Sequence, residues 1–338
     1  MIKESIAKLA EGQNLSREEA HSTMVEIMSG EATPAQIASY ITALRIRGET
    51  PDIIVGSAAG MREKFTAVHA PAGIVVDTCG TGGDGAHTFN ISTCAAFAAT
   101  GAGVTVAKHG NRSVSSKCGS ADVLTALGVK VDATPEVMAG CLKDIGIAFL
   151  FAAALHPAMK HGIGPRREIG IRTIFNILGP LSNPAGAQYG ILGVYDRELT
   201  STLAQAAAEL GAKRLFVVHG LDGLDEITTT TATCVAEVNE GRVTSYEIKP
   251  GDFGIPTANK QELVGGEAAE NAEIVRKVLS GEKGPRRDIV LLNAAAAIVA
   301  GGKAKDFKEG IAAATRSIDS GAAKRKLEQL VELTQKPS

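Results

Sequence analysis

The stretch GIVVDTCGTGGDG, residues 73–85, decides the fold. The β-branched run Ile74, Val75 and Val76 predicts a buried strand, and the glycines that follow predict a tight loop. A helical pattern begins at about Ile91 and extends to about Ala99. A strand followed by a loop and a crossover helix is typical of an α/β fold with a mainly parallel sheet.

The same alternation continues towards the C-terminus. Short apolar runs predict further strands over residues 104–106, 149–151, 189–194 and 215–218. Helices are expected between them from about residue 121 and over residues 135–145, and the turn at residues 239–241 predicts an edge hairpin over residues 232–248. Residues 270–335 have a helical pattern again. We therefore predict one large α/β domain over residues 71–338.

Residues 1–70 have only helical signals and predict a small helical domain. Ser16 with Glu19, and Thr33 with Gln36, form capping-box patterns, and Thr50 precedes a proline at a helix start. One later segment, residues 157–190, carries helix signals in its first part where a strand would continue the alternation. We expect part of this segment to pack on the N-terminal helices and join their domain. The apolar stripes of so small a unit require a partner, either the rest of the chain or a second subunit.

Composition excludes several classes of function. The 338 residues include 35 Lys and Arg against 37 Asp and Glu, and this net charge of −2 argues against a nucleic-acid-binding protein. With 9 Phe, 4 Tyr and no Trp, stacking platforms for bases are not expected. The five scattered cysteines form no CxxC pair, so we expect reduced thiols and a cytoplasmic protein without a structural zinc site. The longest apolar stretches are too short to span a bilayer, and the N-terminus has no apolar run typical of a signal peptide.

Two polar segments follow strands and suit phosphate. The glycine loop is followed by Asn90, Ser92 and Thr93 at the start of a helix, where free N–H groups and the helix dipole favour anions. The loop differs from both the Walker motif and the dinucleotide fingerprint. Residues 108–120 add three cations, four hydroxyls and an amide. The alternatives are a linking turn with simple helix caps for the first segment and a solvated polar loop for the second.

Two further segments lie at the ends of predicted strands. Asp225 and Glu226 follow the strand at 215–218, and adjacent carboxylates suit Mg²⁺, although an acidic turn is the alternative. Arg166, ten residues after His156, can pair bidentately with a carboxylate, but it can also be a surface charge, and a lone histidine such as His156 is more often packed in a core. The carboxyl ends of parallel strands meet at one edge of a sheet. Together the four segments predict a site for a phosphorylated substrate and a metal ion.

Six motifs, distributed along nearly the whole chain, resemble those of the anthranilate phosphoribosyltransferases. They are DTCGTGGDG (77–85), NIST (90–93), KHGNRSVSSKCGSADVLTALG (108–128), HPAMK (156–160), RTIFNILGPLSNPA (172–185) and DGLDEI (222–227). The resemblance implies a small helical domain joined to a large α/β domain, a fold shared with pyrimidine nucleoside phosphorylases, and a homodimer formed through the helical domain. It also implies transfer of the phosphoribosyl group from phosphoribosyl diphosphate (PRPP) to the amine of anthranilate, giving N-(5-phosphoribosyl)anthranilate and diphosphate in tryptophan biosynthesis.

The resemblance also implies roles for individual residues. Those implied to hold PRPP, including a loop that would close over it, are Gly80, Gly83, Asp84, Thr88, Asn90, Ile91, Ser92, Thr93, Lys108, His109, Gly110, Asn111, Arg112, Ser113, Val114, Ser115, Ser116 and Ser120. Those implied to hold Mg²⁺ are Ser92, Asp225 and Glu226. Those implied to contact anthranilate are Gly80, Asn111 and Arg166. The aniline nitrogen is already neutral at pH 7, so no strong base is required, and His109 is only a candidate general base.

Two other functions remain as alternatives. A pyrimidine nucleoside phosphorylase of the same fold would use phosphate as the nucleophile on a nucleoside, but the KHGNR segment and the pair Asp225 and Glu226 favour the transferase. A non-catalytic relative would bind nucleic acid through the basic segment 108–120, which the net charge of −2 disfavours. We therefore expect small-molecule substrates and neither a nucleic acid nor a membrane as a partner.

Overall fold

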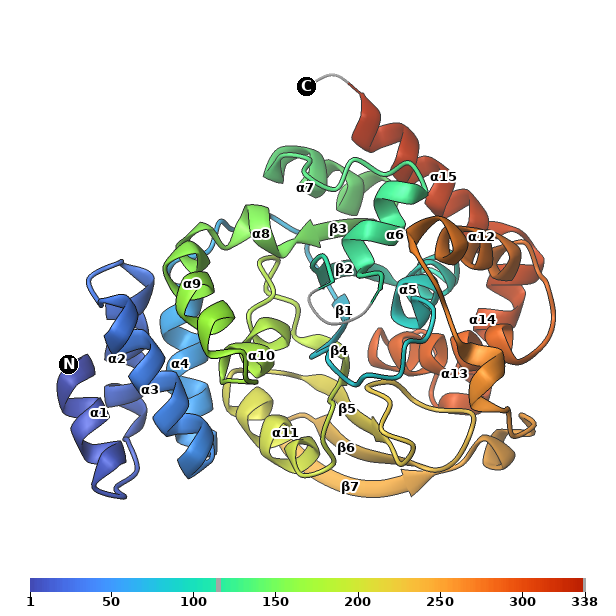
Figure 1. The fold of residues 1–338 in the computed structure, drawn as a ribbon. Helices are drawn as coiled ribbons and strands as arrows, with labels where there is room; N and C mark the ends of the chain where they lie inside the picture. The colour runs from blue at the N-terminus through green and yellow to red at the C-terminus, as the bar shows by residue number, and fades with distance from the viewer. Residues whose placement is uncertain (114–116, 337–338) are drawn as a thin grey trace.

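A computed structural model describes residues 1–113 and 117–336. A seven-stranded sheet crosses its centre in the order β3-β2-β1-β4-β5-β6-β7 (Figure 1). Its strands are β1 (Val75–Gly80), β2 (Thr105–Gly110), β3 (Ile147–Phe151), β4 (Tyr189–Gly193), β5 (Arg214–Gly220), β6 (Thr233–Asn239) and β7 (Arg242–Ile248). Strands β1 to β5 are parallel to one another, β6 pairs antiparallel with β5, and β6 and β7 form an antiparallel hairpin at the edge. The mainly parallel sheet and the edge hairpin are thus confirmed.

Helices connect and cover these strands. The N-terminal helices are α1 (Ile2–Ala10), α2 (Arg17–Met28), α3 (Pro34–Arg47) and α4 (Pro51–Arg62). Those between β1 and β4 are α5 (Ile91–Gly101), α6 (Ser120–Ala126), α7 (Pro135–Asp144), α8 (Ala152–Leu155), η1 (Pro157–Met159), α9 (Lys160–Ile169), α10 (Phe175–Leu178) and η2 (Gly179–Leu181). The remaining helices are α11 (Leu199–Glu209), η3 (Pro250–Phe253), η4 (Lys260–Leu263), α12 (Ala268–Leu279), α13 (Pro285–Ala300), α14 (Phe307–Asp319) and α15 (Ala322–Gln335). No helix within residues 1–113 or 117–336 is both long and apolar enough to cross a bilayer.

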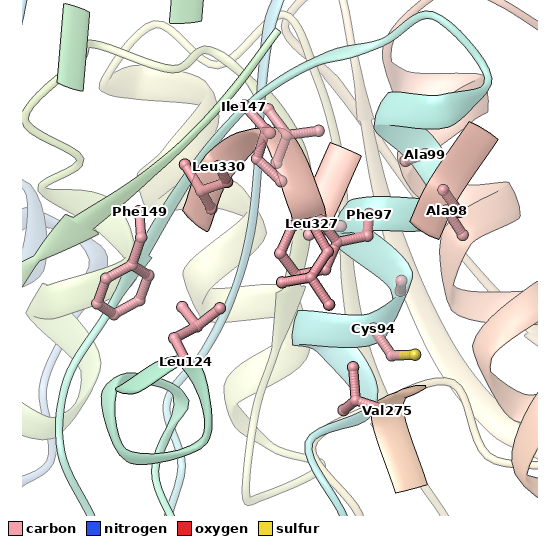
Figure 2. Packing of buried hydrophobic residues seen from close by; sticks show 14 of the residues in the cluster. Cys94, Phe97, Ala98, Ala99, Leu124, Ile147, Phe149, Val275, Leu327 and Leu330 are labelled. Atoms are coloured by element: carbon pink, nitrogen blue, oxygen red, sulfur yellow. The ribbon is translucent and has the colours of Figure 1, made fainter. Parts of the chain in front are cut away.

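Helix α5 is the centre of the larger core. Its residues from Thr93 to Thr100 are all buried, as expected of a helix that is apolar on every side. Figure 2 shows Phe97 of this helix beside Leu327 of α15, and Val275 of α12 lies in the same buried cluster. Because α5 begins at the carboxyl end of β1, this packing fixes the helix N-terminus at the edge of the sheet.

The N-terminal helices lie at one end of the molecule, away from α5 (Figure 1). The two capping boxes form as expected, at Ser16 and at Thr33. Helix α9 packs against α2 and α3, and Phe175 of α10 belongs to the same buried cluster as residues of α1 to α4. The segment after β3 therefore does contact the N-terminal helices. A domain boundary at residue 70 stays a prediction.

Two strands run further than their apolar residues indicate. β1 continues to Gly80, which pairs with Gly193 of β4, and β2 continues to Gly110, which pairs with Phe151 of β3. Lys108 and His109 are therefore strand residues, and the expectation that they follow the end of the strand was wrong. Backbone hydrogen bonds carry a parallel strand past its apolar run, so polar side chains do not end it.

β1 lies between β2 and β4. The chain adds β2 and β3 on one side of β1 and then crosses over to add β4 on its other side. Ligands of open α/β sheets bind outside the carboxyl ends of the strands at such a switch point. The glycine loop begins at this position, directly after Gly80.

Candidate active site

The glycine loop is held against β4 and the acidic loop. Thr81 donates its backbone N–H to the Gly193 carbonyl at 2.8 Å. The backbone at Gly82, Gly83 and Gly85 has φ of 65°, 75° and 70°, a region that glycine adopts without strain. At these three positions no side chain covers the backbone of the loop.

Three carboxylates gather below this loop. Asp225 accepts a hydrogen bond from the Gly82 nitrogen at 2.8 Å, and its own nitrogen faces a carboxylate oxygen of Asp84 at 3.5 Å. Glu226 accepts from the nitrogen of Ser92 at 3.1 Å. Burial, followed by the charge of Asp84, raises the pKa of Asp225 to about 7. Burial, followed by the charge of Asp225, raises the pKa of Glu226 to about 8. Such a group is stabilised in its ionised form by a cation.

Lys108 places a positive charge at the N-terminus of α5. Its Nζ donates to the carbonyl of Thr78 at 2.7 Å and to Oγ of Ser92 at 3.1 Å. The side chain is 4% exposed, and within the described residues it forms no ion pair. A buried ammonium beside a helix N-terminus attracts an anion, so this part of the site suits phosphate.

Asn90 does not act as a helix cap, although it stands at the N-cap position of α5. Its Nδ2 donates to the Cys118 carbonyl at 3.2 Å, and its Oδ1 accepts from Nδ2 of Asn271 at 3.0 Å. Thr88 pairs with Val264 in an isolated β-bridge. The residues before α5 are therefore tied to α12 and to the loop after β2.

The loop after β2 is organised by Asp122 of α6. One carboxylate oxygen accepts from the nitrogens of Ser113 and Gly119 at 3.0 and 2.9 Å, and the other accepts from Nη1 of Arg112 at 2.8 Å. Asn111 is exposed, and its Oδ1 accepts from the nitrogen of Arg112. Ser120 begins α6 and donates its hydroxyl to the Asn111 carbonyl. The candidate residues Val114, Ser115 and Ser116 lie outside the described residues.

His109 is poorly suited to be a general base. Its Nδ1 contacts the Gly179 carbonyl at 3.2 Å, and because a carbonyl only accepts, this nitrogen carries the proton. Nε2 is then the acceptor, and it faces Nε2 of His156 at 3.2 Å. Burial, followed by the charge of His156, lowers the pKa of His109 to about 3. The histidine pair therefore packs between β2, η2 and the end of α8.

Arg166 and Arg172 differ in their relation to the glycine loop. The guanidinium of Arg166 lies over the Phe175 ring, 5.3 Å from its centre, and burial lowers its pKa. Within the described residues it forms a hydrogen bond with neither Asn111 nor the glycine loop. Arg172 instead donates Nη2 to the Gly83 carbonyl and lies 4.3 Å from the centre of the Tyr195 ring. The structure thus brings Arg172, which was quoted in a motif but given no role, to the glycine loop.

Two groups of side chains present metal-ligand atoms. Asp77, Cys79 and His109 place one ligand atom each within 4.8 Å of one another. Both oxygens of Asp77 are already used, however, by the nitrogen of His109 and by Nδ2 of Asn183. The carboxylates of Asp84, Asp225 and Glu226 are not all within that distance of one another in this structure, but they offer the oxygen atoms that Mg²⁺ prefers, so by ligand type they are the better fit for this ion.

Comparison with known proteins places the whole chain in one family. Residues 3–65 match the model described as "Glycosyl transferase family, helical bundle domain", and residues 72–324 match "Glycosyl transferase family, a/b domain". A relative from Anaeromyxobacter sp. (strain K), named anthranilate phosphoribosyltransferase, is 57% identical over 100% of both chains. The chain belongs to the anthranilate phosphoribosyltransferase family.

Solved structures of anthranilate phosphoribosyltransferases have the same fold. The Thermus thermophilus enzyme has a TM-score of 0.94 and 42% identity, over 98% of this chain and 99% of that one. The Saccharomyces cerevisiae enzyme in complex with PRPP and Mg has a TM-score of 0.91 and 30% identity, over 98% and 97%. A complex of the yeast enzyme with 4-fluoroanthranilate has a TM-score of 0.88 and 29% identity, over 98% and 97%.

Sequence reasoning missed several residues that position the candidate site. Asn183, in the GPLSNP motif, donates Nδ2 both to Asp77 at 2.7 Å and to the Ala107 carbonyl at 2.9 Å, and so ties this motif to β1 and β2. Asn271 supports Asn90 from α12, where no pattern in the sequence singles it out. Asn293 is the residue that the sequence does single out. It is an amide flanked on both sides by apolar residues, a pattern that indicates a buried polar group with specific partners.

Proposed function

We propose that this chain transfers the phosphoribosyl group of PRPP to the amine of anthranilate, giving N-(5-phosphoribosyl)anthranilate and diphosphate in tryptophan biosynthesis. The observation that carries the proposal is that a buried ammonium and two buried carboxyl groups lie beside the same helix N-terminus at the switch point. Buried Lys108 and the N-terminus of α5 suit an anion, and Asp225 and Glu226 beside the same helix N-terminus suit a cation. A magnesium diphosphate ester requires both kinds of group at once.

The PRPP site would be assembled from three elements. The backbone of the glycine loop, including Gly80 and Gly83, would approach the phosphates, since no Cβ intervenes. Lys108 and Ser92 would bind a phosphate group beside the N-terminus of α5. The loop expected to close over the substrate runs from His109 to Ser116, and Asp122 holds its described residues Arg112 and Ser113.

Mg²⁺ would be held by Asp225 and Glu226, with Ser92 as a third candidate, and when bound it would neutralise charge on the diphosphate. The rest of catalysis would fall to the chain itself. Breaking the C1–O bond leaves an oxocarbenium-like sugar and a diphosphate anion, so Lys108 and the loop N–H groups would stabilise the leaving charge. Glu226 already receives the Ser92 N–H and would keep the acidic loop against α5.

Anthranilate would be positioned rather than activated. Its amine is neutral at pH 7, and the Nε2 lone pair of His109 faces His156, so we assign no general base. Arg166, with Asn111 and Gly80, would hold the carboxylate and ring and aim the nitrogen at C1. The structure places Arg166 over the Phe175 ring and Asn111 at the start of the loop after β2.

The proposal also covers assembly and location. Residues 1–70, with part of 157–190, would form one domain through which two copies associate. Its outer face carries a groove between α1 and α3 that is lined by Ile6, Leu9 and Ile46, and Ile46 is 79% exposed. The five cysteines are all free, which fits a reducing compartment such as the cytoplasm.

The test is to measure loss of anthranilate fluorescence with PRPP and Mg²⁺. We expect consumption that requires all three components. Phosphate-dependent cleavage of thymidine, without anthranilate consumption, would instead support the nucleoside phosphorylase. If neither reaction occurs and salt-dependent binding to nucleic acid is found, the enzymatic proposal is wrong.

A further inference from the structure

Helix α13 contains a run of apolar residues, IVLLNAAAAIVA, that is interrupted only by Asn293. The side chain is 1% exposed. An amide in such surroundings is costly unless its polar atoms are paired. Its hydrogen bonds therefore show what the residue does.

Asn293 binds the backbone of one residue twice. Its Oδ1 accepts from the nitrogen of Ile227 at 2.9 Å, and its Nδ2 donates to the carbonyl of the same residue at 2.8 Å. The second hydrogen of Nδ2 goes to the Ile289 carbonyl, one turn earlier in α13, at 2.9 Å. This third bond fixes the amide plane, so the clamp on Ile227 has a single orientation.

Ile227 directly follows Glu226 in the acidic loop. The loop is also held further along, because Asp222 accepts from the hydroxyls of Thr228 and Thr230 at 2.8 and 2.5 Å. Asp222 stabilises the turn internally, however, whereas Asn293 joins it to a buried helix. The clamp from α13 therefore fixes the backbone that follows Glu226, while the hydrogen bond from the Ser92 nitrogen holds the Glu226 side chain against α5.

We propose that Asn293 is a positioning residue for the metal-binding carboxylates, Asp225 and Glu226. It fixes the backbone after Glu226. The loop that carries both carboxylates therefore does not have to become ordered when the cation binds. The inference rests on the proposed function, because it takes these two residues as the Mg²⁺ ligands. Asn293 itself touches neither metal nor substrate.

The experiment measures Mn²⁺ binding to the full chain in the presence of inorganic diphosphate, by titration calorimetry. Asn293→Leu keeps a similar volume and removes the whole clamp, and Asn293→Asp keeps only the acceptor. We expect Asn293→Leu to weaken Mn²⁺ binding roughly 10- to 100-fold, as is typical for loss of a residue that orients metal ligands. Asn293→Asp should fall between it and the wild type. Hydrogen exchange at the Ile227 amide should accelerate in the Leu variant.

The control is Leu291→Ala. Leu291 is buried in the same helix but belongs to a cluster that does not include Ile227. This variant should lower stability and leave Mn²⁺ affinity unchanged. If Leu291→Ala loses as much Mn²⁺ affinity as Asn293→Leu, or if Asn293→Leu keeps wild-type affinity, the role of Asn293 is wrong and the proposed function is unaffected. A wild-type chain that binds no Mn²⁺ with diphosphate would overturn the proposed function as well.

Discussion

The carboxylate of Asp225 accepts a hydrogen bond from the backbone nitrogen of Gly82 at 2.8 Å, although 143 residues separate the two in the chain. The glycine loop and the acidic loop are therefore held together directly. A Cβ built on Gly80 would lie 2.5 Å from Oδ2 of Asp225, so the two loops meet where no side chain fits. Phosphate and metal recognition are expected to change together when this junction is disturbed.

Gly80→Ala should damage catalysis more than folding. The added methyl group must displace the Asp225 carboxylate, so we expect kcat/KM for PRPP to fall at least about tenfold, equivalent to about 1.4 kcal/mol. Gly140→Ala in α7 is the matched control, because its Cβ meets nothing within 4 Å. Steady-state kinetics of both variants provide the measurement. Normal kinetics in Gly80→Ala would show that the junction tolerates the methyl group.

The double variant Asp225→Asn with Glu226→Gln should weaken the Mg²⁺-dependent use of PRPP. Both changes keep the size of the side chain and remove the charges that would hold the cation. We expect the Mg²⁺ concentration for half-maximal activity to rise at least about tenfold, with circular dichroism unchanged. An unaltered Mg²⁺ activation curve in the folded variant would reject these residues as the metal ligands.

Mg²⁺ with diphosphate should stabilise the protein more at pH 8.5 than at pH 5.5. Burial raises the folded-state pKa of Asp225 to about 7 and of Glu226 to about 8, above the ordinary values of carboxyl groups. Their contribution to stability is therefore complete below the unfolded pKa values and is lost as pH rises towards 8. A bound cation removes this loss. The increase in Tm on adding Mg²⁺ with diphosphate is measured by thermal unfolding at both pH values. An equal increase at pH 5.5 and pH 8.5 would contradict Asp225 and Glu226 as the metal ligands.

The sequence predicted the fold well because its signals are local. Apolar runs and glycines marked the strands, and Ser16 and Thr33 carry capping boxes that depend only on residues three positions away. The predicted strands at residues 74–76 and 104–106 end too early. Hydrogen bonds to neighbouring strands extend β1 through Asp77 and β2 through Lys108. Such pairing is not visible in a local pattern.

The candidate site was predictable only in part, for the same reason. The glycine loop, Lys108 and the acidic pair were recognisable by composition and by their place after strands. The contacts that position them join distant segments, as Asn183 does with Asp77 across 106 residues. Arg172 appeared only within a motif, and nothing in its immediate sequence indicates that it reaches Gly83.

Charge on the outer groove of the N-terminal helices should disrupt a dimer. Ile46 is 79% exposed and lines the groove between α1 and α3, where an apolar side chain of this size is unfavourable unless covered. Ile46→Glu should shift the mass measured by light scattering from dimer to monomer. Ile163→Glu, on an exposed position of α9 outside the groove, is the control. A wild-type chain that is monomeric at micromolar concentration contradicts the proposed assembly.

Arg166→Ala should impair the use of anthranilate specifically. Anthranilate carries a carboxylate ortho to its amine, and a guanidinium can fix it with two parallel hydrogen bonds. Losing a charge-assisted bond costs ~1.5–3 kcal/mol, so the KM for anthranilate should rise roughly 10- to 150-fold, while that for PRPP changes little. Arg166→Lys should restore it only in part, because an ammonium keeps the charge but not the fork.

Arg167→Ala is the matched control for this prediction. Arg167 is the next residue of α9 and is exposed, whereas Arg166 is half-buried over Phe175. Its replacement should leave both KM values within about twofold of the wild type, as expected for an exposed charge. A severe Arg167→Ala with a harmless Arg166→Ala would exchange their roles. If both variants keep a normal KM for anthranilate, the carboxylate is bound elsewhere, and Arg172, already in contact with Gly83, becomes the residue to replace next.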